Sequence, residues 1–173
     1  MEYAIVLHLD DKNAEQIQKI TEYIAVCTGN DYMISNHIPP HITIAGFCAD
    51  DGTDISGIAA DIAASICSFD VQIVTVGIFN PYVVFAAPVM NKGLLNACET
   101  ANKILQTKGF ECNQIYTPYN WVPHTSLAVR LNEASISNAV KAALEKFQPV
   151  MAAVDKLSIA ACDPYKEIET SDL

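Results

Sequence analysis

Pro40-His41-Ile42-Thr43-Ile44-Ala45 occurs a second time, in altered form, as Pro123-His124-Thr125-Ser126-Leu127-Ala128. Proline, histidine and alanine recur unchanged, and Thr/Ser and Ile/Leu exchanges keep the character of two further positions. A hydroxyl two residues after a single histidine would be weak evidence, because serine and threonine are common. Two copies, each framed by the same proline and alanine, indicate a duplicated unit in which both motifs have a role.

The segments that flank the two copies follow the same order. The first half is predicted to contain a strand at 3–9, a helix at 11–27, the motif strand at 41–47, a helix at 54–68 and a strand at 69–79. The second half repeats this order with a strand at 82–85, a helix at 91–107, the motif strand at 124–130, a helix at 134–147 and a strand at 150–161. The sequence therefore predicts a duplicated α+β fold with pseudo-two-fold symmetry.

A chain of 173 residues is long enough for one compact domain with a sizeable core. We expect a single domain over 1–173, made of two repeat lobes at about 1–80 and 81–165, with possible exchange of strands between the lobes. The acidic segment 166–173 is expected to be a frayed, solvated tail.

Each motif predicts one polar and one apolar strand face, because side chains alternate along a strand. His41 and Thr43 share a face, as do His124 and Ser126, whereas Thr125 falls on the face expected to meet the core. Two histidines can serve as proton acceptor and proton donor near neutral pH, and two hydroxyls can hold a phosphate by hydrogen bonds. The alternative is that both histidines are structural residues left over from duplication.

This pair of His-x-Thr/Ser motifs, 83 residues apart in a small duplicated α+β chain, resembles the two-histidine (2H) phosphoesterases, which include 2′-5′ RNA ligase-like proteins and cyclic phosphodiesterases. The resemblance implies antiparallel sheets that line a central cleft, with helices outside. It also implies a metal-independent enzyme without a cofactor that opens 2′,3′-cyclic phosphates or related 2′-linked phosphodiesters, with His41, His124, Thr43 and Ser126 as catalytic residues. RNA-end processing at 2′-5′ linkages and a non-catalytic nucleotide-binding module are the alternatives.

Three further side chains are candidates for substrate binding. Arg130, the only arginine, is in phase with His124 on the predicted strand and could bind an anion, although a surface ion pair is an equally simple interpretation. Tyr119 and Trp121 precede the second motif and could stack a base, but aromatic residues more often serve packing.

The composition narrows the class of ligand and the setting. The net charge of −10 makes an extended nucleic-acid surface improbable, so a small nucleotide or an RNA terminus is the expected partner. No apolar run is long enough to span a membrane, and no basic, apolar leader begins the sequence. Six cysteines without a C-x-x-C pair predict reduced, buried thiols. Reduced thiols are typical of the cytoplasm, where we expect this protein. We also expect it to be a monomer.

Overall fold

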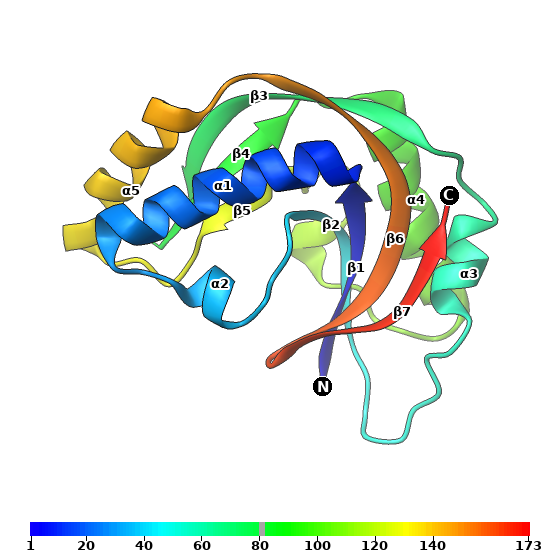
Figure 1. Ribbon diagram of the computed structural model, residues 1–173. Coiled ribbons are helices and arrows are strands. Elements are labelled where there is room, and N and C mark those ends of the chain that lie inside the picture. The colour runs from blue at the N-terminus through cyan, green and yellow to red at the C-terminus, as the bar shows by residue number, and fades with distance from the viewer. Residues whose placement is uncertain (80–81) are drawn as a thin grey trace.

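The computed structural model describes residues 1–79 and 82–173 of the chain (Figure 1). Its helices and strands follow one another as β1 (Glu2–Leu9), α1 (Asp11–Thr28), α2 (Tyr32–Ser35), β2 (His41–Cys48), α3 (Ile58–Ala63), β3 (Phe69–Phe79), β4 (Val83–Pro88), α4 (Lys92–Thr107), the 3-10 helix η1 (Gln114–Tyr116), β5 (Thr125–Ala128), α5 (Glu133–Lys146), β6 (Val150–Cys162) and β7 (Tyr165–Asp172). The α+β class predicted from the sequence is confirmed.

The strand order reflects the duplication of the sequence. Across the sheet the strands follow the order β2-β1-β6-β3-β4-β5, and every pairing is antiparallel. β7 pairs with residues 156–162 of β6, beyond the residues 150–154 that pair with β3. The first strand of each half, β1 or β4, pairs with the motif strand of its own half. The order therefore reads alike from both ends, and the two motif strands occupy its two ends.

One long strand joins the two halves into a single antiparallel sheet. β6 is 13 residues long and curves around the molecule, pairing with β3 near its start and with β1 further on (Figure 1). Because the sheet is strongly curved, its end strands β2 and β5 approach each other. This closure brings together two motifs that are far apart along the strand order.

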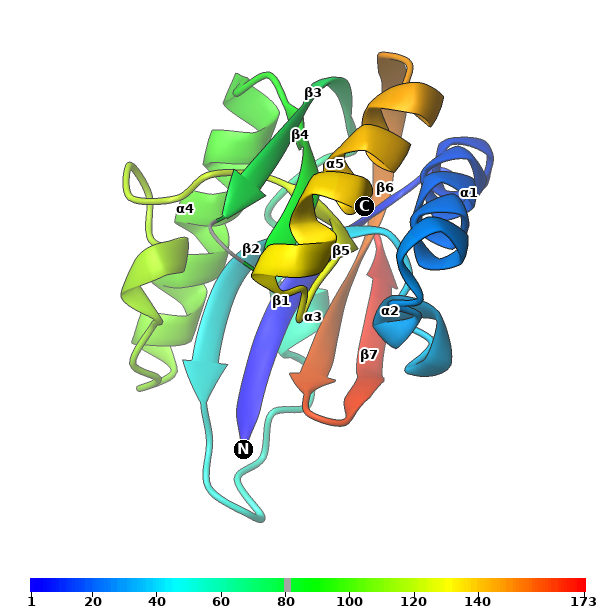
Figure 2. The ribbon, with the colours of Figure 1, turned by 90° about the vertical axis from the view of Figure 1, so that its left-hand side faces the viewer.

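The helices lie outside the sheet and cover the apolar side chains. α1 and α5 pack on each other, while α3 and α4 lie together at the other side (Figures 1 and 2). α1 begins after Asp10, whose carboxylate accepts a hydrogen bond from the Asn13 amide, and ends at Gly29, whose φ of 73° suits glycine. Its buried face, with Ile17 and Ile24 fully enclosed, packs into the main core.

Two predicted elements differ from the structure. The helix expected at 54–68 is confined to Ile58–Ala63, because Gly57 adopts a left-handed φ of 74° and Asp54 holds a turn through hydrogen bonds to Ser56. The predicted frayed tail at 166–173 is wrong, because this segment belongs to β7 and pairs with β6. Lys166, Glu167 and Asp172 are exposed, as a strand at the sheet edge allows, whereas one carboxylate oxygen of Glu169 is buried without a hydrogen-bond partner among the described residues.

Other expectations concern the cysteines, the lobes and the membrane. Only Cys98 and Cys112 are buried, so the prediction of generally buried thiols is wrong, although all six cysteines are unpaired.

The expected boundary between lobes at 80/81 lies outside the described residues. Within the part of the chain that the structure describes, no helix is both long and apolar enough to cross a membrane.

Candidate active site

The two motif copies meet at one pocket of about 210 Å³. His41 begins β2 and His124 immediately precedes β5, and both side chains line this pocket together with Thr43 and Ser126. The other lining residues come from both halves of the chain and are Glu2, Tyr3, Ala4, Val6, Met33, Ile38, Gly46, Tyr116, Val129, Ala160, Cys162 and Tyr165. The structure thus brings together the four residues predicted to be catalytic.

The two imidazoles are anchored in the same way. His41 Nδ1 lies 2.8 Å from the carbonyl oxygen of Pro39, and His124 Nδ1 lies 2.8 Å from that of Val122. Because a carbonyl oxygen only accepts, Nδ1 carries the proton and donates it in both rings. Each Nε2 is therefore the nitrogen that remains to accept or give a proton, which is the arrangement that acid-base chemistry at a shared ligand requires.

The opposite faces of the motif strands belong to the core, as the alternation predicts. Ile42, Ile44 and Leu127 are completely buried. Thr125 takes the place equivalent to Ile42 in the second copy and is also completely buried. Its hydroxyl oxygen finds no hydrogen-bond partner among the described residues, so this position carries a polar group that the core does not satisfy.

His41 is surrounded by polar and aromatic side chains. Its ring is stacked on Tyr165, with 5.9 Å between ring centroids and 22° between planes. Burial lowers the pKa of His41 from 6.5 to about 4, and the positive charges that His8 and His124 can carry act in the same direction. The bond to Pro39 and the charge of Glu167 oppose this shift of the pKa. His41 is therefore neutral at pH 7 in the ligand-free protein.

His124 has an apolar setting instead. Phe79 packs edge-on against its ring at 4.8 Å between centroids, and Phe85 contacts it at 5.3 Å. Burial against these side chains lowers the pKa of His124, while the hydrogen bond to the Val122 carbonyl raises it. Two rings with equal backbone anchors thus differ in what packs against them.

Arg130 does not reach the pocket, and the prediction that it is in phase with His124 is wrong. β5 ends at Ala128 and Arg130 has a left-handed φ of 54°, so the alternation of side chains stops before it. The guanidinium lies 4.2 Å from the centroid of the Tyr32 ring and 3.6 Å from a carboxylate oxygen of Asp163. The simpler interpretation, a surface ion pair, describes this side chain.

The two aromatic residues before the second motif also lie away from the pocket lining. Trp121 is 6% exposed and belongs to the core, so neither face of its indole is available to stack a base. Tyr119 is 84% exposed, and its hydroxyl donates to Glu99 at 3.3 Å. Both residues are close to His124 in sequence, but the chain turns at Tyr119, where φ is 69°, and the two side chains point to the surface and to the core instead of the pocket.

Two other aromatic side chains line the pocket in their place: Tyr116, which belongs to the same aromatic segment before the second motif, and Tyr165, which the sequence did not indicate. Tyr116 approaches Gly46 so closely that a Cβ on the glycine would lie 3.1 Å from the ring. Tyr165 begins β7 and contributes its ring beside His41. The turn at Asp163-Pro164, followed by alternating Tyr165 and Glu167, is the sequence signal that could have identified this strand. Among residues 1–79 and 82–173, no three His, Cys, Asp or Glu side chains are grouped so as to hold a metal ion.

The sequence of the chain matches one protein family over most of its length. The model of the 2′-5′ RNA ligase superfamily matches residues 9–163. The chain belongs to this superfamily. The resemblance to 2H phosphoesterases, drawn from two short motifs, is thereby confirmed at the level of the family. No curated protein matches the chain in a sequence search.

Solved structures share the fold along the whole chain. LigT of E. coli complexed with 3′-AMP has a TM-score of 0.68 at 13% identity, covering 99% of this chain and 97% of its own. TT0787 of Thermus thermophilus has a TM-score of 0.68 at 14% identity, covering 100% and 98%. A crystal structure described only as a phosphoesterase has a TM-score of 0.67 at 15% identity, covering 99% and 97%. At such identities the likeness establishes the fold alone.

Proposed function

We propose that this member of the superfamily is a metal-independent phosphoesterase that opens 2′,3′-cyclic phosphates, or related 2′-linked phosphodiesters, of small nucleotides. The observation that carries the proposal is the meeting of both His-x-Thr/Ser motifs at one pocket, each with Nδ1 bonded to a carbonyl and Nε2 left available. A pair of imidazoles that flank one anion supplies both proton transfers of a phosphodiester hydrolysis.

In the proposed reaction His41 is the base and His124 is the acid. The low pKa of His41 keeps it neutral at pH 7, so its Nε2 takes a proton from the attacking water. The water oxygen bonds to phosphorus, and the bond between phosphorus and one ribose oxygen breaks. His124, protonated when the phosphodiester anion is bound beside it, gives its Nε2 proton to that departing oxygen. The product is a ribose phosphomonoester.

Thr43 and Ser126 are proposed to donate hydrogen bonds to the non-bridging oxygens of the phosphate. Both hydroxyl side chains line the same pocket as the imidazoles, one from each motif strand. Donors that are held in place at the oxygens where negative charge develops stabilise the transition state without reorganising. The two hydroxyls would thus contribute to turnover more than to binding.

The charge of the pocket favours a substrate with one negative charge. Among the described pocket-lining residues there is neither lysine nor arginine, whereas Glu2 contributes a carboxylate. A phosphodiester with one negative charge meets less repulsion here than a diphosphate or a long RNA, and the net charge of −10 acts in the same direction. We therefore favour 2′,3′-cyclic mononucleotides over ADP-ribose cyclic phosphate. The family match keeps cleavage or joining of 2′-5′ linkages as the second candidate.

A panel assay tests the proposal. Purified protein is incubated with the four 2′,3′-cyclic mononucleotides, 2′-5′ oligoadenylate and ADP-ribose cyclic phosphate, with and without EDTA, and the products are assigned by 31P NMR. We expect turnover of cyclic mononucleotides that EDTA does not change. Turnover of 2′-5′ oligoadenylate alone would favour the second candidate, and tight nucleotide binding without turnover of any substrate would show a non-catalytic module.

A further inference from the structure

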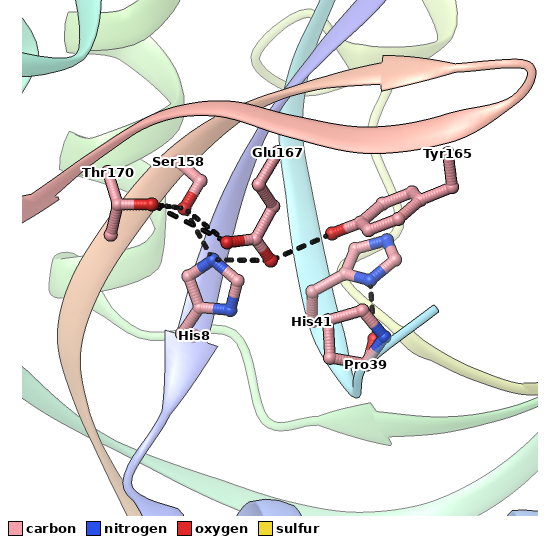
Figure 3. A network of polar contacts seen from close by, with 7 residues as sticks. All are labelled: His8, Pro39, His41, Ser158, Tyr165, Glu167 and Thr170. Carbon is pink, nitrogen blue, oxygen red and sulfur yellow. Dashed lines mark hydrogen bonds and ion pairs between the residues drawn. The ribbon is translucent and has the colours of Figure 1, made fainter. Parts of the chain in front are cut away.

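A polar network that no part of the proposed reaction uses lies next to His41, and of its residues Tyr165 lines the pocket. Tyr165 donates from its hydroxyl to Glu167 Oε1 at 3.2 Å, and these residues are neighbours on one face of β7 (Figure 3). The other carboxylate oxygen of Glu167 accepts from the hydroxyls of Ser158 and Thr170, each at 3.4 Å. His8 Nε2 lies 3.7 Å from Glu167 Oε1.

The network is fixed from two strands. Ser158 and Thr170 are paired residues on β6 and β7, and their hydroxyls are 2.8 Å apart. Ser158 is completely buried and also contacts His8 Nε2 at 2.8 Å. His8 in turn lies opposite His41 in the pairing of β1 with β2. Glu167 is therefore held at a defined place although it lies on an edge strand.

The network reaches His41 through the Tyr165 ring. The Nδ1 bond to Pro39 holds the imidazole at one atom only, and the stacked Tyr165 ring limits how the imidazole can tilt about that bond. Burial and Glu167 raise the pKa of Tyr165, so its hydroxyl stays a donor throughout the working range of pH. The ring also packs on the cluster of Ala4, Val6 and Ala160, and the bond to Glu167 fixes its hydroxyl end.

We propose that Tyr165 and Glu167 form a positioning pair that orients His41 Nε2 for proton transfer and distinguishes His41 from His124. His124 contacts two phenylalanines, Phe79 and Phe85, whose rings have no polar group to anchor them. The inference rests on the proposed function for its catalytic consequence, but the orientation of His41 can be measured without a substrate.

The charges that face His41 predict the effect on its titration. They come from His8 on β1, from His124 beside β5 and from Glu167 on β7, while Lys156 and Asp155 act on His8. Of the groups that face His41, the two histidines lower its pKa and Glu167 raises it. Glu167→Gln keeps an acceptor for Tyr165 but removes the negative charge, so the pKa of His41 falls further. Tyr165→Phe keeps the ring but removes the hydroxyl.

The test compares these variants with a matched pair elsewhere. Tyr23 donates to Glu145 at 3.0 Å between α1 and α5, and neither residue lines the pocket. Tyr23→Phe therefore removes the same kind of bond as Tyr165→Phe, and Glu145→Gln removes the same kind of charge as Glu167→Gln. We measure kcat, KM and the pH profile of kcat/KM on a 2′,3′-cyclic nucleotide, and follow the His41 ring nitrogens by 15N NMR from pH 3 to 8. Circular dichroism establishes that each variant is folded.

We expect Tyr165→Phe to lower kcat about 10-fold with little change in KM, because a displaced catalytic group slows the reaction without weakening binding. Glu167→Gln should move the His41 titration and the acid limb of the profile to lower pH, and the Tyr23 and Glu145 variants should match the wild type. Unchanged kcat and His41 titration in both folded variants would overturn the inference, as would a rise in KM alone. If the wild type turns over no substrate, the proposed function fails. The positioning role is then decided by Tyr165→Phe, which keeps every charge near His41: the inference expects the His41 ring 15N signals to move in this variant, and unchanged signals would overturn it.

Discussion

The two motif copies share a backbone arrangement but differ in their surroundings. His41 and His124 each donate from Nδ1 to the carbonyl two residues earlier, at 2.8 Å in both cases. Around His41 the sheet supplies Tyr165 and a polar network, whereas around His124 it supplies Phe79 and Phe85. Duplication thus explains why two imidazoles face one pocket, and the divergence of their neighbours explains how two equivalent groups can take unequal roles.

The largest expected effect comes from removing either of the two imidazoles. His41→Ala and His124→Ala should each lower kcat by between about 10²- and 10⁴-fold, because each removes one of the two proton transfers. The double variant should be little worse than either single variant, since the groups act as a unit. Initial rates on a 2′,3′-cyclic nucleotide measure this, and full activity in either single variant would contradict the shared role.

The hydroxyls of Thr43 and Ser126 test next whether the two motif copies are equivalent. Thr43→Val and Ser126→Ala should each lower kcat by about 10²-fold, because each removes a donor to the charge that develops on the phosphate. Single-turnover rates separate this effect from binding. If one variant raises KM and leaves kcat unchanged, that hydroxyl serves binding and the two copies are less alike than proposed.

Stability at mildly acidic pH distinguishes the two histidines. The pKa of His41 is about 4 in the fold and 6.5 ordinarily, so between these values the unfolded chain binds more protons and the fold loses stability as pH falls. The drop in Tm between pH 7 and pH 5 should therefore be smaller in His41→Gln than in the wild type. His124→Gln should reduce this drop less, because its pKa is lowered by a smaller amount. Equal drops in all three proteins would show that the two sides titrate alike.

A smaller effect concerns the core-facing position of each copy. Thr125 carries a buried hydroxyl without a partner among the described residues, where the first copy has Ile42. Thr125→Val should raise the free energy of unfolding by about 1 kcal/mol, because it removes a buried polar group without changing the shape of the side chain. Urea denaturation measures the change, and kcat should stay at the wild-type value. A loss of stability would show that the hydroxyl is satisfied in solution.

The smallest effect is expected away from the pocket. Tyr119→Ala should leave kcat/KM on cyclic nucleotides at the wild-type value, since this exposed side chain bonds to Glu99 and does not line the pocket. Steady-state rates across the four bases measure it. A loss that depends on the base would restore Tyr119 as a stacking residue and place the substrate beyond the pocket lining.

The sequence predicted those features that depend on local pattern. Alternation placed Ile42, Leu127 and Thr125 on the buried side of the motif strands, and the repeated phrase identified His41 and His124 as a pair. These inferences succeed because the period of a strand is short and a residue's face follows from its position alone.

The sequence did not predict what depends on a turn or on distant pairing. Arg130 and Tyr119 both have positive φ. At Arg130 this ends the alternation on which its predicted placement relied, and at Tyr119 it marks a turn, so closeness in sequence to His124 does not bring the side chain to the pocket. Tyr165 reaches His41 because β7 pairs with β6, and the acidic composition of that segment had indicated a free tail. Pairing energy comes largely from the backbone, which composition does not reveal.

A titration of both rings with one anion tests the central claim most directly. The ring nitrogens of His41 and His124 are followed by 15N NMR while inorganic phosphate is added at pH 6, where its monoanion predominates. The account predicts that both Nε2 signals shift together along one binding curve, with both Nδ1 nitrogens protonated throughout. A shift confined to one ring, or two curves with different midpoints, would contradict a single site shared by the two motifs.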